Sequence, residues 1–446
     1  MKRVAVIGGG LAGITAALEL ADAGCAVALF EARPKLGGLT HSFERHGRWI
    51  DNGQHVFLRC CTSYLRLLDR LGVRDQVQLQ RRLDVPVRSG LHSGVGRIRR
   101  NGMPAPLHLG PALASYRWLS VAERVAAMRA ALAIARVDRT TAEADAQSFG
   151  EWLAAHGQSP RAVEALWELI GIATLNARAD DASLAVAATV FQLGLLERSD
   201  AADIGWSLVP LQQLHGDAAA RVLMAAGVAV RLRARIRALE EGDGAWAIEG
   251  EEYDDVVLAV PPAEAAGLLP DGAVELPAGW AEALGSSPIV NAHVIFDRAV
   301  LHEPFVAGVD SPLQWVFDRT VQSCGGVHGD RDEQYLAVSL SAADELIDAP
   351  VADLREVLVP ALRQLLPAAA DARVKEFFVT RERHATFRAA PGSGRLRPGA
   401  TTARAGLHLA GAWTATGWPA TMEGAVRSGE AAAASVLQTS ALPVAS

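Results

Sequence analysis

A glycine-rich turn follows a short apolar run at the start of this 446-residue chain. Residues 4–13 read Val-Ala-Val-Ile-Gly-Gly-Gly-Leu-Ala-Gly, and the first four are long enough for a buried parallel strand. Gly8, Gly10 and Gly13 stand in G-x-G-x-x-G spacing, and residues 14–23 predict a helix. The first glycine permits the tight turn, the second lets the backbone approach a pyrophosphate, and the third lets helix and strand pack closely. The unit therefore predicts a dinucleotide site in an α/β domain.

The residues after this turn predict which dinucleotide binds. A second strand, residues 26–30, ends at Glu31, whose carboxylate can accept a hydrogen bond from a ribose hydroxyl. The helix N-terminus offers free N–H groups and a positive dipole end to the phosphates. A basic residue and a glycine pair then bring a second stretch of backbone close to the ligand. This extended pattern resembles the FAD enzymes of the amine oxidase and phytoene desaturase superfamily. The resemblance implies cofactor contacts from Gly8, Gly10, Leu11, Ala12, Gly13, Glu31, Ala32, Arg33, Gly37, Gly38 and Leu39.

Composition limits the class of protein. Hydrophobic residues make up 50% of the chain and charged residues 21%, as expected for a well-buried globular enzyme. The net charge of -7, without a long basic run, argues against nucleic acid as a partner. The four cysteines show neither metal-ligand spacing nor a disulfide framework, which fits a reducing cytoplasm and predicts no metal site. Because the first strand begins at residue 3 or 4, and no apolar run reaches about 18–20 residues, we expect neither a signal peptide nor a membrane span.

The pattern along the chain predicts two interleaved domains, because a chain of 446 residues is too long to fold around a single hydrophobic core. We expect an α/β fold: a Rossmann-like FAD-binding domain, interleaved with a substrate domain of mixed sheet and helices. The FAD-binding domain is expected from residues 1–80, 208–265 and 405–440, and the substrate domain from 81–207 and 266–404. Helical patterns at 118–137, 149–156, 161–175 and 183–195 predict a helical insert over a ligand cavity. Strand patterns return at 227–240, 255–260, 290–296, 335–339, 375–387 and 407–410.

A second candidate cofactor segment lies near the C-terminus. A predicted strand ends at Gly411, a loop follows, and a helix is expected to begin near Thr421 as its N-cap. In FAD proteins of this superfamily the matching helix aims its N–H groups at the pyrimidine edge of the flavin, which implies contacts from Ala420, Thr421, Met422 and Ala425. Many relatives carry an acidic residue where this chain has Ala412, so either another group supplies that contact or FAD binds less tightly. Ile236 and Val260 match positions near the adenine and the flavin, although both are also ordinary strand residues.

Residues 49–57 contain a distinctive polar segment, in which Asn52, Gly53, Gln54 and His55 follow a short predicted strand. Taken with Ala173-Thr174-Leu175-Asn176 and the block 414–421, this segment resembles the hydroxysqualene dehydroxylases, also described as squalene-associated FAD-dependent desaturases of bacterial hopanoid pathways. The resemblance covers nearly the whole chain. It implies that Asn52, Gly53, Gln54 and His55 lie beside the flavin.

The resemblance implies a reductive step on a C30 isoprenoid. Hydroxysqualene is an allylic alcohol, so loss of its hydroxyl as water leaves a delocalised cation, and hydride from flavin N5 then gives squalene. The protein must shape an apolar tunnel, exclude water and protonate the leaving oxygen. His55 is the candidate acid, because the reference pKa of histidine lies near neutrality, and Asn176 and Gln54 are candidates to orient the hydroxyl. His293 and His384 are weaker candidates, and Lys375 is the one lysine that could serve flavin N5.

Several alternatives remain open from the sequence. An oxidative isoprenoid desaturase of the phytoene type would share fold, cofactor and substrate class. An amine oxidase would need an aromatic cage, and the chain has only four tyrosines. A non-catalytic flavoprotein that scaffolds other squalene-pathway enzymes is a third reading. The single dinucleotide fingerprint predicts no separate NAD(P)H site and names no electron donor.

The substrate class suggests contact with a membrane, because a C30 isoprenoid is nearly insoluble in water. The predicted helix 118–137 carries Trp118 and aliphatic residues beside Arg117, Arg124 and Arg129, as in interfacial helices. A core helix with solvated arginines explains the same pattern. We therefore expect a cytoplasmic protein with peripheral contact to the inner face of the cell membrane.

Overall fold

The first layer is a five-stranded parallel sheet. The computed structural model describes residues 1–242, 244–325 and 333–439. The strand order is β10-β2-β1-β14-β20, with every neighbouring pair parallel. The bounds are β1 Arg3–Ile7, β2 Ala26–Glu31, β10 Ala229–Leu232, β14 Asp255–Leu258 and β20 Leu407–Leu409. Parallel strands place all their carboxyl ends at one edge, which is where open α/β sheets bind ligands.

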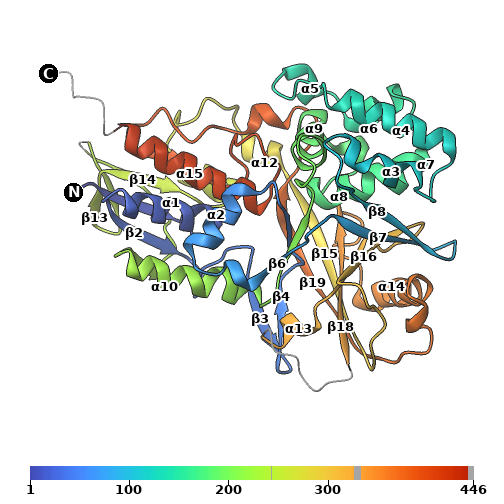
Figure 1. Ribbon diagram of the computed structural model, residues 1–446. Coiled ribbons are helices and arrows are strands. Elements are labelled where there is room, and N and C mark those ends of the chain that lie inside the picture. The colour runs from blue at the N-terminus through green and yellow to red at the C-terminus, as the bar shows by residue number, and fades with distance from the viewer. Residues whose placement is uncertain (243, 326–332, 440–446) are drawn as a thin grey trace.

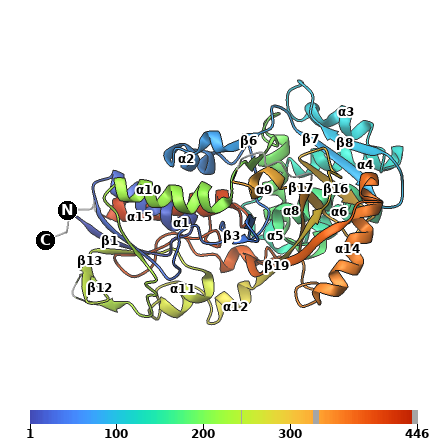
Figure 2. The same cartoon turned by 90° about the horizontal axis from the view of Figure 1, so that it is seen from below.

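Both faces of this sheet are covered, as its apolar strands require. Val4 and Val6 pack beneath α1 (Leu11–Asp22), α10 (Ala218–Ala225) and α15 (Met422–Thr439). The alternate residues of β1 face a small antiparallel sheet of β11 (Glu240–Glu241), β12 (Trp246–Ile248) and β13 (Glu251–Tyr253). Figure 2 shows the three helices on one side and β12, β13 and α11 (Pro262–Leu268) on the other.

The second layer is a seven-stranded mixed sheet in the order β19-β15-β18-β17-β16-β7-β8. Its strands are β7 Asp84–Ser89, β8 Val95–Arg99, β15 Ser286–Phe296, β16 Phe305–Val309, β17 Trp315–Asp318, β18 Gln334–Ser341 and β19 Val374–Phe387. Val290 and Val294 pack on one face with residues of α14 (Val351–Leu365), which lies beside this sheet in Figure 1. On the other face, Phe305, Ala307 and Phe317 share a buried cluster with residues of the helical insert. The fold class expected from the sequence is confirmed, whereas the domain boundaries stay a prediction.

The helical insert differs in detail from the sequence pattern. The helix expected over 118–137 is α4, Val121–Ile134, because Ser120 caps it in a reciprocal capping box with Glu123. The runs at 161–175 and 183–195 are each interrupted by a π-helical turn, at Val163–Trp167 and Gln192–Leu196. The remaining helices include α3 Gly110–Ala114, α6 Phe149–Ala155, α8 Glu168–Leu175 and α9 Leu184–Phe191. The segment expected as a strand over 227–240 contains only β10 before residue 240, and Arg233 follows it with a positive φ of 58°.

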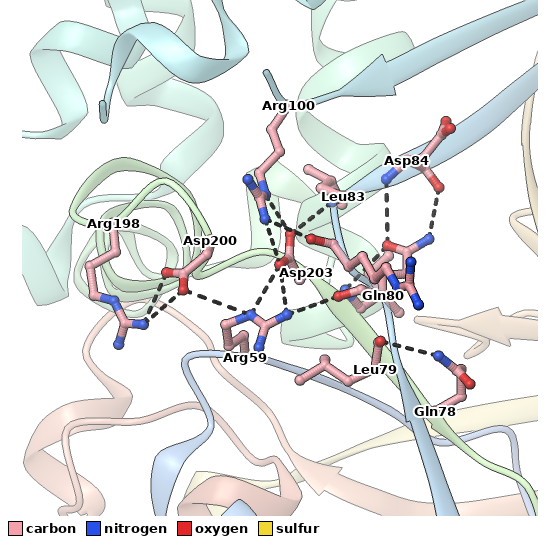
Figure 3. A network of polar contacts seen from close by, with 12 residues as sticks. Arg59, Gln78, Leu79, Gln80, Leu83, Asp84, Arg100, Arg198, Asp200 and Asp203 are labelled. Carbon is pink, nitrogen blue, oxygen red and sulfur yellow. Dashed lines mark hydrogen bonds and ion pairs between the residues drawn. The ribbon is translucent and has the colours of Figure 1, made fainter. Parts of the chain in front are cut away.

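A buried carboxylate joins the second sheet to a third, which contains β5 (Val56–Leu58), β9 (Ile204–Ser207) and β6 (Val77–Leu79) (Figure 3). Asp203 precedes β9 and is fully buried. It accepts hydrogen bonds from the side chains of Arg59 and Arg100 and from the N–H of Leu83. Burial alone would raise the pKa of Asp203, but Arg100 and Arg59 outweigh it and hold the pKa below its usual value. The carboxylate therefore stays charged and connects segments that flank both sheets.

Candidate cofactor and substrate site

The glycine-rich turn closes at the carboxyl edge of the five-stranded sheet. Gly8 has a φ of +114°, and a Cβ there would lie 2.2 Å from the carbonyl oxygen of Ala259. A Cβ on Gly13 would lie 1.9 Å from the carbonyl oxygen of Gly8, so the helix and the turn touch through backbone. Gly10 differs, because its Cβ would meet nothing nearer than the Cα of Gly38 at 3.8 Å. The first and third glycines are therefore required by the fold itself, while the second leaves open space in front of the turn.

The start of α1 presents unpaired donors to this space. Gly10 is the N-cap, and neither a capping side chain nor an acidic first-turn residue satisfies the helix. In the part of the chain that the structure describes, the amides of residues 10–13 have no hydrogen-bond acceptor. A free helix N-terminus of this kind attracts phosphate oxygens. The helix begins three residues earlier than the apolar spacing predicted, so Leu11 and Ala12 belong to its first turn.

Glu31 lies beside the same turn. Its carboxylate is buried and accepts hydrogen bonds from the N–H of Gly9 at 2.6 Å and of Arg33 at 2.7 Å. Each carboxylate oxygen can accept a further bond, so both retain capacity for ribose hydroxyls. The backbone after β10 runs alongside, because the N–H of Ala234 donates to the carbonyl of Glu31. This places the buried Ile236 two residues beyond that contact.

The glycine pair 37–38 packs directly on the first turn. The N–H of Gly37 donates to the carbonyl of Gly9 at 2.9 Å, and a Cβ on Gly38 would lie 2.9 Å from the Cα of Gly10. Both glycines have positive φ. Arg33 and Leu39 are exposed at the rim. The two glycine segments expected from the sequence to hold a dinucleotide therefore lie in contact.

The C-terminal segment meets the turn from the other side. The indole N–H of Trp413 donates to the carbonyl of Val260 at 3.0 Å. The Oγ1 of Thr421 accepts the N–H of Gly424 at 3.1 Å, which confirms Thr421 as the N-cap of α15. Within the described residues, the N–H groups of Met422 and Glu423 have no acceptor. A second helix N-terminus with free donors thus lies near the first, with Ala420 before it and Ala425 one turn inside.

Arg397 holds the loop that contains Ala412, and sequence reasoning missed it. Its guanidinium donates to the carbonyls of Ala412, Trp413, Thr414 and Trp418, at 2.6 to 3.3 Å. The group also stacks over Phe387, 4.5 Å from the ring centroid. Burial lowers the pKa of Arg397 to about 10, so it remains charged at neutral pH. The loop after Gly411 is therefore ordered by a buried cation.

The polar segment 51–55 is anchored by its first residue. Asp51 pairs with the buried Arg319 at 2.5 Å and accepts hydrogen bonds from the Ser42 hydroxyl and the Leu211 N–H. Asn52 is linked to the glycine pair through His41, since its N–H donates to the carbonyl of His41 at 3.0 Å and His41 Nδ1 lies 3.1 Å from the carbonyl of Gly38. The segment therefore lies next to the dinucleotide turn.

A directed chain of hydrogen bonds ties this segment to the seven-stranded sheet. The Tyr335 hydroxyl contacts His293 Nδ1 at 2.7 Å, His293 Nε2 contacts the Thr380 hydroxyl at 2.9 Å, and Thr380 donates to the carbonyl of Asn52 at 3.0 Å. Burial lowers the pKa of His293 to about 3, and burial raises the pKa of Tyr335. The phenol therefore donates to Nδ1, and the neutral ring donates from Nε2 to Thr380. His293 positions Asn52 through this chain.

His55 is a neutral imidazole in this environment. Burial lowers its pKa and the charge of Arg319 lowers it further, while the carbonyl of Gly53 and the charge of Asp51 oppose the shift in part. Its Nδ1 lies 2.9 Å from the Gly53 carbonyl, so Nδ1 carries the proton and Nε2 the lone pair. Gln54 is half-buried beside it, and the Gln54 amide donates to the carbonyl of His55 at 3.3 Å.

Asn176 lies at the end of α8 in the left-handed conformation, with its side chain fully engaged. Its Nδ2 donates to the Ser287 carbonyl and the Thr386 hydroxyl at 3.0 Å each, and its Oδ1 accepts the Ala342 N–H at 2.6 Å. It clamps the helical insert to the second sheet, and no described contact joins it to His55. The weaker candidates also lie apart, because His384 is exposed beside Ser286 and Lys375 pairs with Glu333.

Two helix N-termini with free donors, a buried ribose acid and two touching glycine turns fit a dinucleotide with a flavin end. The fold and this site define an FAD-dependent oxidoreductase. The chain belongs to the flavin containing amine oxidoreductase family, whose sequence profile matches residues 11–437.

Individual relatives refine this assignment. The chain is 30% identical to the hydroxysqualene dehydroxylase of Sinorhizobium fredii, over 97% of each chain. It is 26% identical to the 15-cis-phytoene desaturase of Synechococcus elongatus, over 98% of this chain and 96% of that one. Among solved structures, a triple mutant of putrescine oxidase has a TM-score of 0.73 at 20% identity, covering 98% of this chain and 99% of that one. The resemblance to hydroxysqualene dehydroxylases and the FAD cofactor are thereby confirmed, and putrescine oxidase shares the fold.

Proposed function

We propose that this protein removes the hydroxyl of hydroxysqualene reductively, giving squalene. The observation that carries the proposal is the 30% identity to a hydroxysqualene dehydroxylase over 97% of each chain. The overall reaction converts an allylic alcohol and reduced FAD into the hydrocarbon, oxidised FAD and water. Reduced FAD, when bound, supplies the hydride at N5 and the accompanying proton.

The residues that would hold FAD act through backbone amides and one carboxylate. The amides of residues 10–13 would bind the pyrophosphate, and Glu31 the ribose hydroxyls. The free amides at the start of α15 would face the pyrimidine edge of the flavin and stabilise negative charge on the reduced ring. Arg397 would hold the loop around Ala412 in place beside the cofactor, through its hydrogen bonds to four backbone carbonyls of that loop.

The sheet face toward the helical insert suits an apolar chain. Trp206, Phe305, Trp315 and Phe317 contact one another there, with ring centroids 5.7 to 6.0 Å apart. Trp206 and Trp315 are only half-buried, so aromatic surface remains for a ligand to cover. We propose that the isoprenoid packs along these rings and that His55, with Gln54 beside it, contacts the hydroxyl. Asn176 acts as a positioning residue, because its amide group is already saturated.

The proposal is tested with the flavin reduced in the absence of oxygen. Adding hydroxysqualene should reoxidise the flavin and yield one squalene per flavin, as followed by absorbance and by lipid extraction. Squalene itself is the control and should leave the flavin reduced. A flavin that stays reduced beside intact alcohol would refute the dehydroxylase. Reduction of oxidised flavin by a more saturated isoprenoid would instead identify an oxidative desaturase.

We also propose that one face of α4 contacts the bilayer that supplies the substrate. Val121, Val125 and Leu132 are exposed along α4. Leu91 and Leu107 are exposed on the β7–β8 turn and on the segment before α3, the helix that contacts both α4 and β8. Arginines also lie on this side, with Arg117 and Arg129 exposed. Trp118 does not take part, because it is buried and its indole donates to the Val87 carbonyl. No helix of the described residues is long and apolar enough to cross a bilayer.

The α4 face can be tested by sedimentation with anionic liposomes. Replacing Val121, Val125 and Leu132 together by serine should reduce the bound fraction, because their burial in the interface is lost. Met224→Ser, at an exposed apolar position on α10, is the control and should sediment like the parent. An unchanged bound fraction for the triple variant would remove α4 from the contact.

A further inference from the structure

Asn291 carries a buried donor without a partner. It lies in β15, is 1% exposed, and points from the sheet face that also carries His293. Its Oδ1 accepts the N–H of Gln54 at 3.4 Å, while its Nδ2 has no acceptor among the described residues. The backbone N–H of Gln54 can only donate, so the side-chain amide of Asn291 must turn its Oδ1, and not its Nδ2, toward Gln54. Leaving a buried NH2 group unpaired costs free energy, and native proteins rarely keep one without a ligand or water to satisfy it.

The space beside this donor is bounded by His55 and kept open by a glycine. A Cβ on Gly53 would lie 3.3 Å from Asn291 Nδ2 and 3.7 Å from His55 Cε1, so a side chain at residue 53 would fill the gap between them. His55 directs Nδ1 at the carbonyl of Gly53, which leaves the lone pair of Nε2 without a donor in the described chain. A donor and an acceptor therefore flank one small space.

We infer that Asn291 and His55 form a hydroxyl-binding site for the isoprenoid substrate, an inference that rests on the proposed function. The alcohol oxygen would accept from Asn291 Nδ2, and its O–H would donate to His55 Nε2. A hydroxyl does both at once, whereas a hydrocarbon does neither, so the pair selects the alcohol over squalene. As the C–O bond breaks, its electron pair moves onto oxygen, where the amide donor stabilises the developing charge. Bound reduced FAD would supply the hydride for the new C–H bond and the accompanying proton that converts the leaving group to water, and Asn291 Nδ2 and His55 Nε2 could hold that water as they hold the hydroxyl.

The surrounding structure holds the pair in place. Asn52, adjacent to Gly53, is fixed from the sheet side by the chain of Thr380, His293 and Tyr335. Strand pairing puts Ser339 opposite Asn291, and Trp315 opposite Ser339, on one face. Two strand spacings, about 10 Å, thus separate the hydroxyl anchor from the aromatic rings that we assign to the isoprenoid chain. The anchor would set which carbon lies before the flavin.

The test measures binding to the oxidised holoenzyme, without turnover. The variants are Asn291→Leu, which removes the donor at similar volume, and Ser339→Ala, a control on the same face of the adjacent strand. Hydroxysqualene and squalene are each titrated, and the perturbation of flavin absorbance gives Kd. We expect Asn291→Leu to weaken hydroxysqualene binding at least tenfold and squalene binding less than twofold, while Ser339→Ala changes neither. Flavin content of Asn291→Leu should match the parent, and its thermal stability should fall only slightly, because the lost NH2 group has no partner among the described residues and the lost Oδ1 contact to the Gln54 N–H is long, at 3.4 Å.

Three results would overturn the inference. Equal loss of affinity for both lipids would make Asn291 a general packing residue. A changed flavin spectrum without ligand, with lipid discrimination intact, would assign the amide to the cofactor. Strong destabilisation by Asn291→Leu would make it structural. Failure of the parent to turn over hydroxysqualene would refute the proposed function by a separate measurement, since the titrations involve no turnover.

Discussion

Two glycines of the same motif should fail for different reasons when replaced by alanine. Gly10 has φ −79° and ψ 179°, which alanine adopts freely, and its Cβ would meet nothing nearer than 3.8 Å. Alanine is a poorer N-cap than glycine, so we expect Gly10→Ala to cost the free enzyme no more than about 1 kcal/mol. The methyl group would project into the space in front of the turn, where the pyrophosphate must approach. FAD affinity should therefore fall at least tenfold, or about 1.4 kcal/mol.

Gly13→Ala should damage the fold itself. Its Cβ would lie 1.9 Å from the Gly8 carbonyl oxygen and 3.2 Å from the Cβ of Ala259, so α1 must move away from the sheet. Overpacking of this kind costs about 1–3 kcal/mol, and here it also displaces the turn that binds the cofactor. Stability and FAD affinity should fall together.

The assay uses protein stripped of flavin, with urea unfolding for stability and flavin fluorescence for FAD titration. Gly267→Ala is the control, because it lies in α11 with no atom within 4 Å of its Cβ, and alanine there should be neutral or slightly stabilising. The reasoning is refuted if Gly10→Ala binds FAD like the parent, or if it destabilises the free enzyme as much as Gly13→Ala does.

Three further predictions concern buried ionisable groups. Asp203→Asn should lower the free energy of unfolding by about 3 kcal/mol, because it leaves Arg59 and Arg100 facing a neutral group. Urea unfolding measures this change, and Asp271→Asn, at an exposed position, is the control. Burial lowers the pKa of His293 and of His215 to about 3, so their neutral forms stabilise the fold above pH 6.5 and this stability is lost as pH falls toward 3. At pH 5.5 the free energy of unfolding should be lower by about 1.4 kcal/mol per histidine. The urea concentration at the unfolding midpoint should therefore decrease when the pH is lowered from 7.5 to 5.5, and an unchanged midpoint would contradict the prediction. Arg397→Lys should raise the Kd for FAD several-fold, since an ammonium group cannot both bind four carbonyls and stack on Phe387. Arg395→Lys is the control. Equal Kd values for the two variants would exclude a role of Arg397 in ordering the FAD-binding loop.

The sequence was most informative where backbone shape alone decides the structure. Gly8, Gly13 and the pair 37–38 have positive φ or contacts that exclude a side chain, so their spacing predicted the turns correctly. Thr421 was predicted as an N-cap for a similarly local reason. The predicted bounds of α4 and of the strand after residue 227 were wrong. Ser120 caps the start of α4 and Arg233 ends the strand with a positive φ, and apolar spacing indicates neither of these local conformations.

What the sequence could not predict is long-range pairing of single polar residues. Arg397 and Ala412 are close in sequence, but nothing in the pattern indicated that one guanidinium would bind four carbonyls of the loop. Asn291 lies 237 residues from Gln54, and only the folded sheet shows that its amide lacks a second partner. Asn176 is the opposite case. Its side-chain amide could contact a substrate hydroxyl, but in the fold it is fully engaged in hydrogen bonds that hold the helical insert to the sheet.

A chain of contacts links the glycine turn of the cofactor site to the polar segment that we assign to the substrate site. From Gly10 the backbone contact to Gly38 continues through His41 to Asn52. Thr380 and His293 then carry the connection into the second sheet, two residues from Asn291. Each link is a backbone contact or a hydrogen bond between buried or half-buried groups, so these contacts join the glycine turn directly to the segment that carries His55. The polar segment thus connects the glycine turn to the hydroxyl anchor that we propose, so Gly13→Ala, which displaces the turn, should also disturb that anchor, whereas Gly10→Ala should leave it in place in the free enzyme.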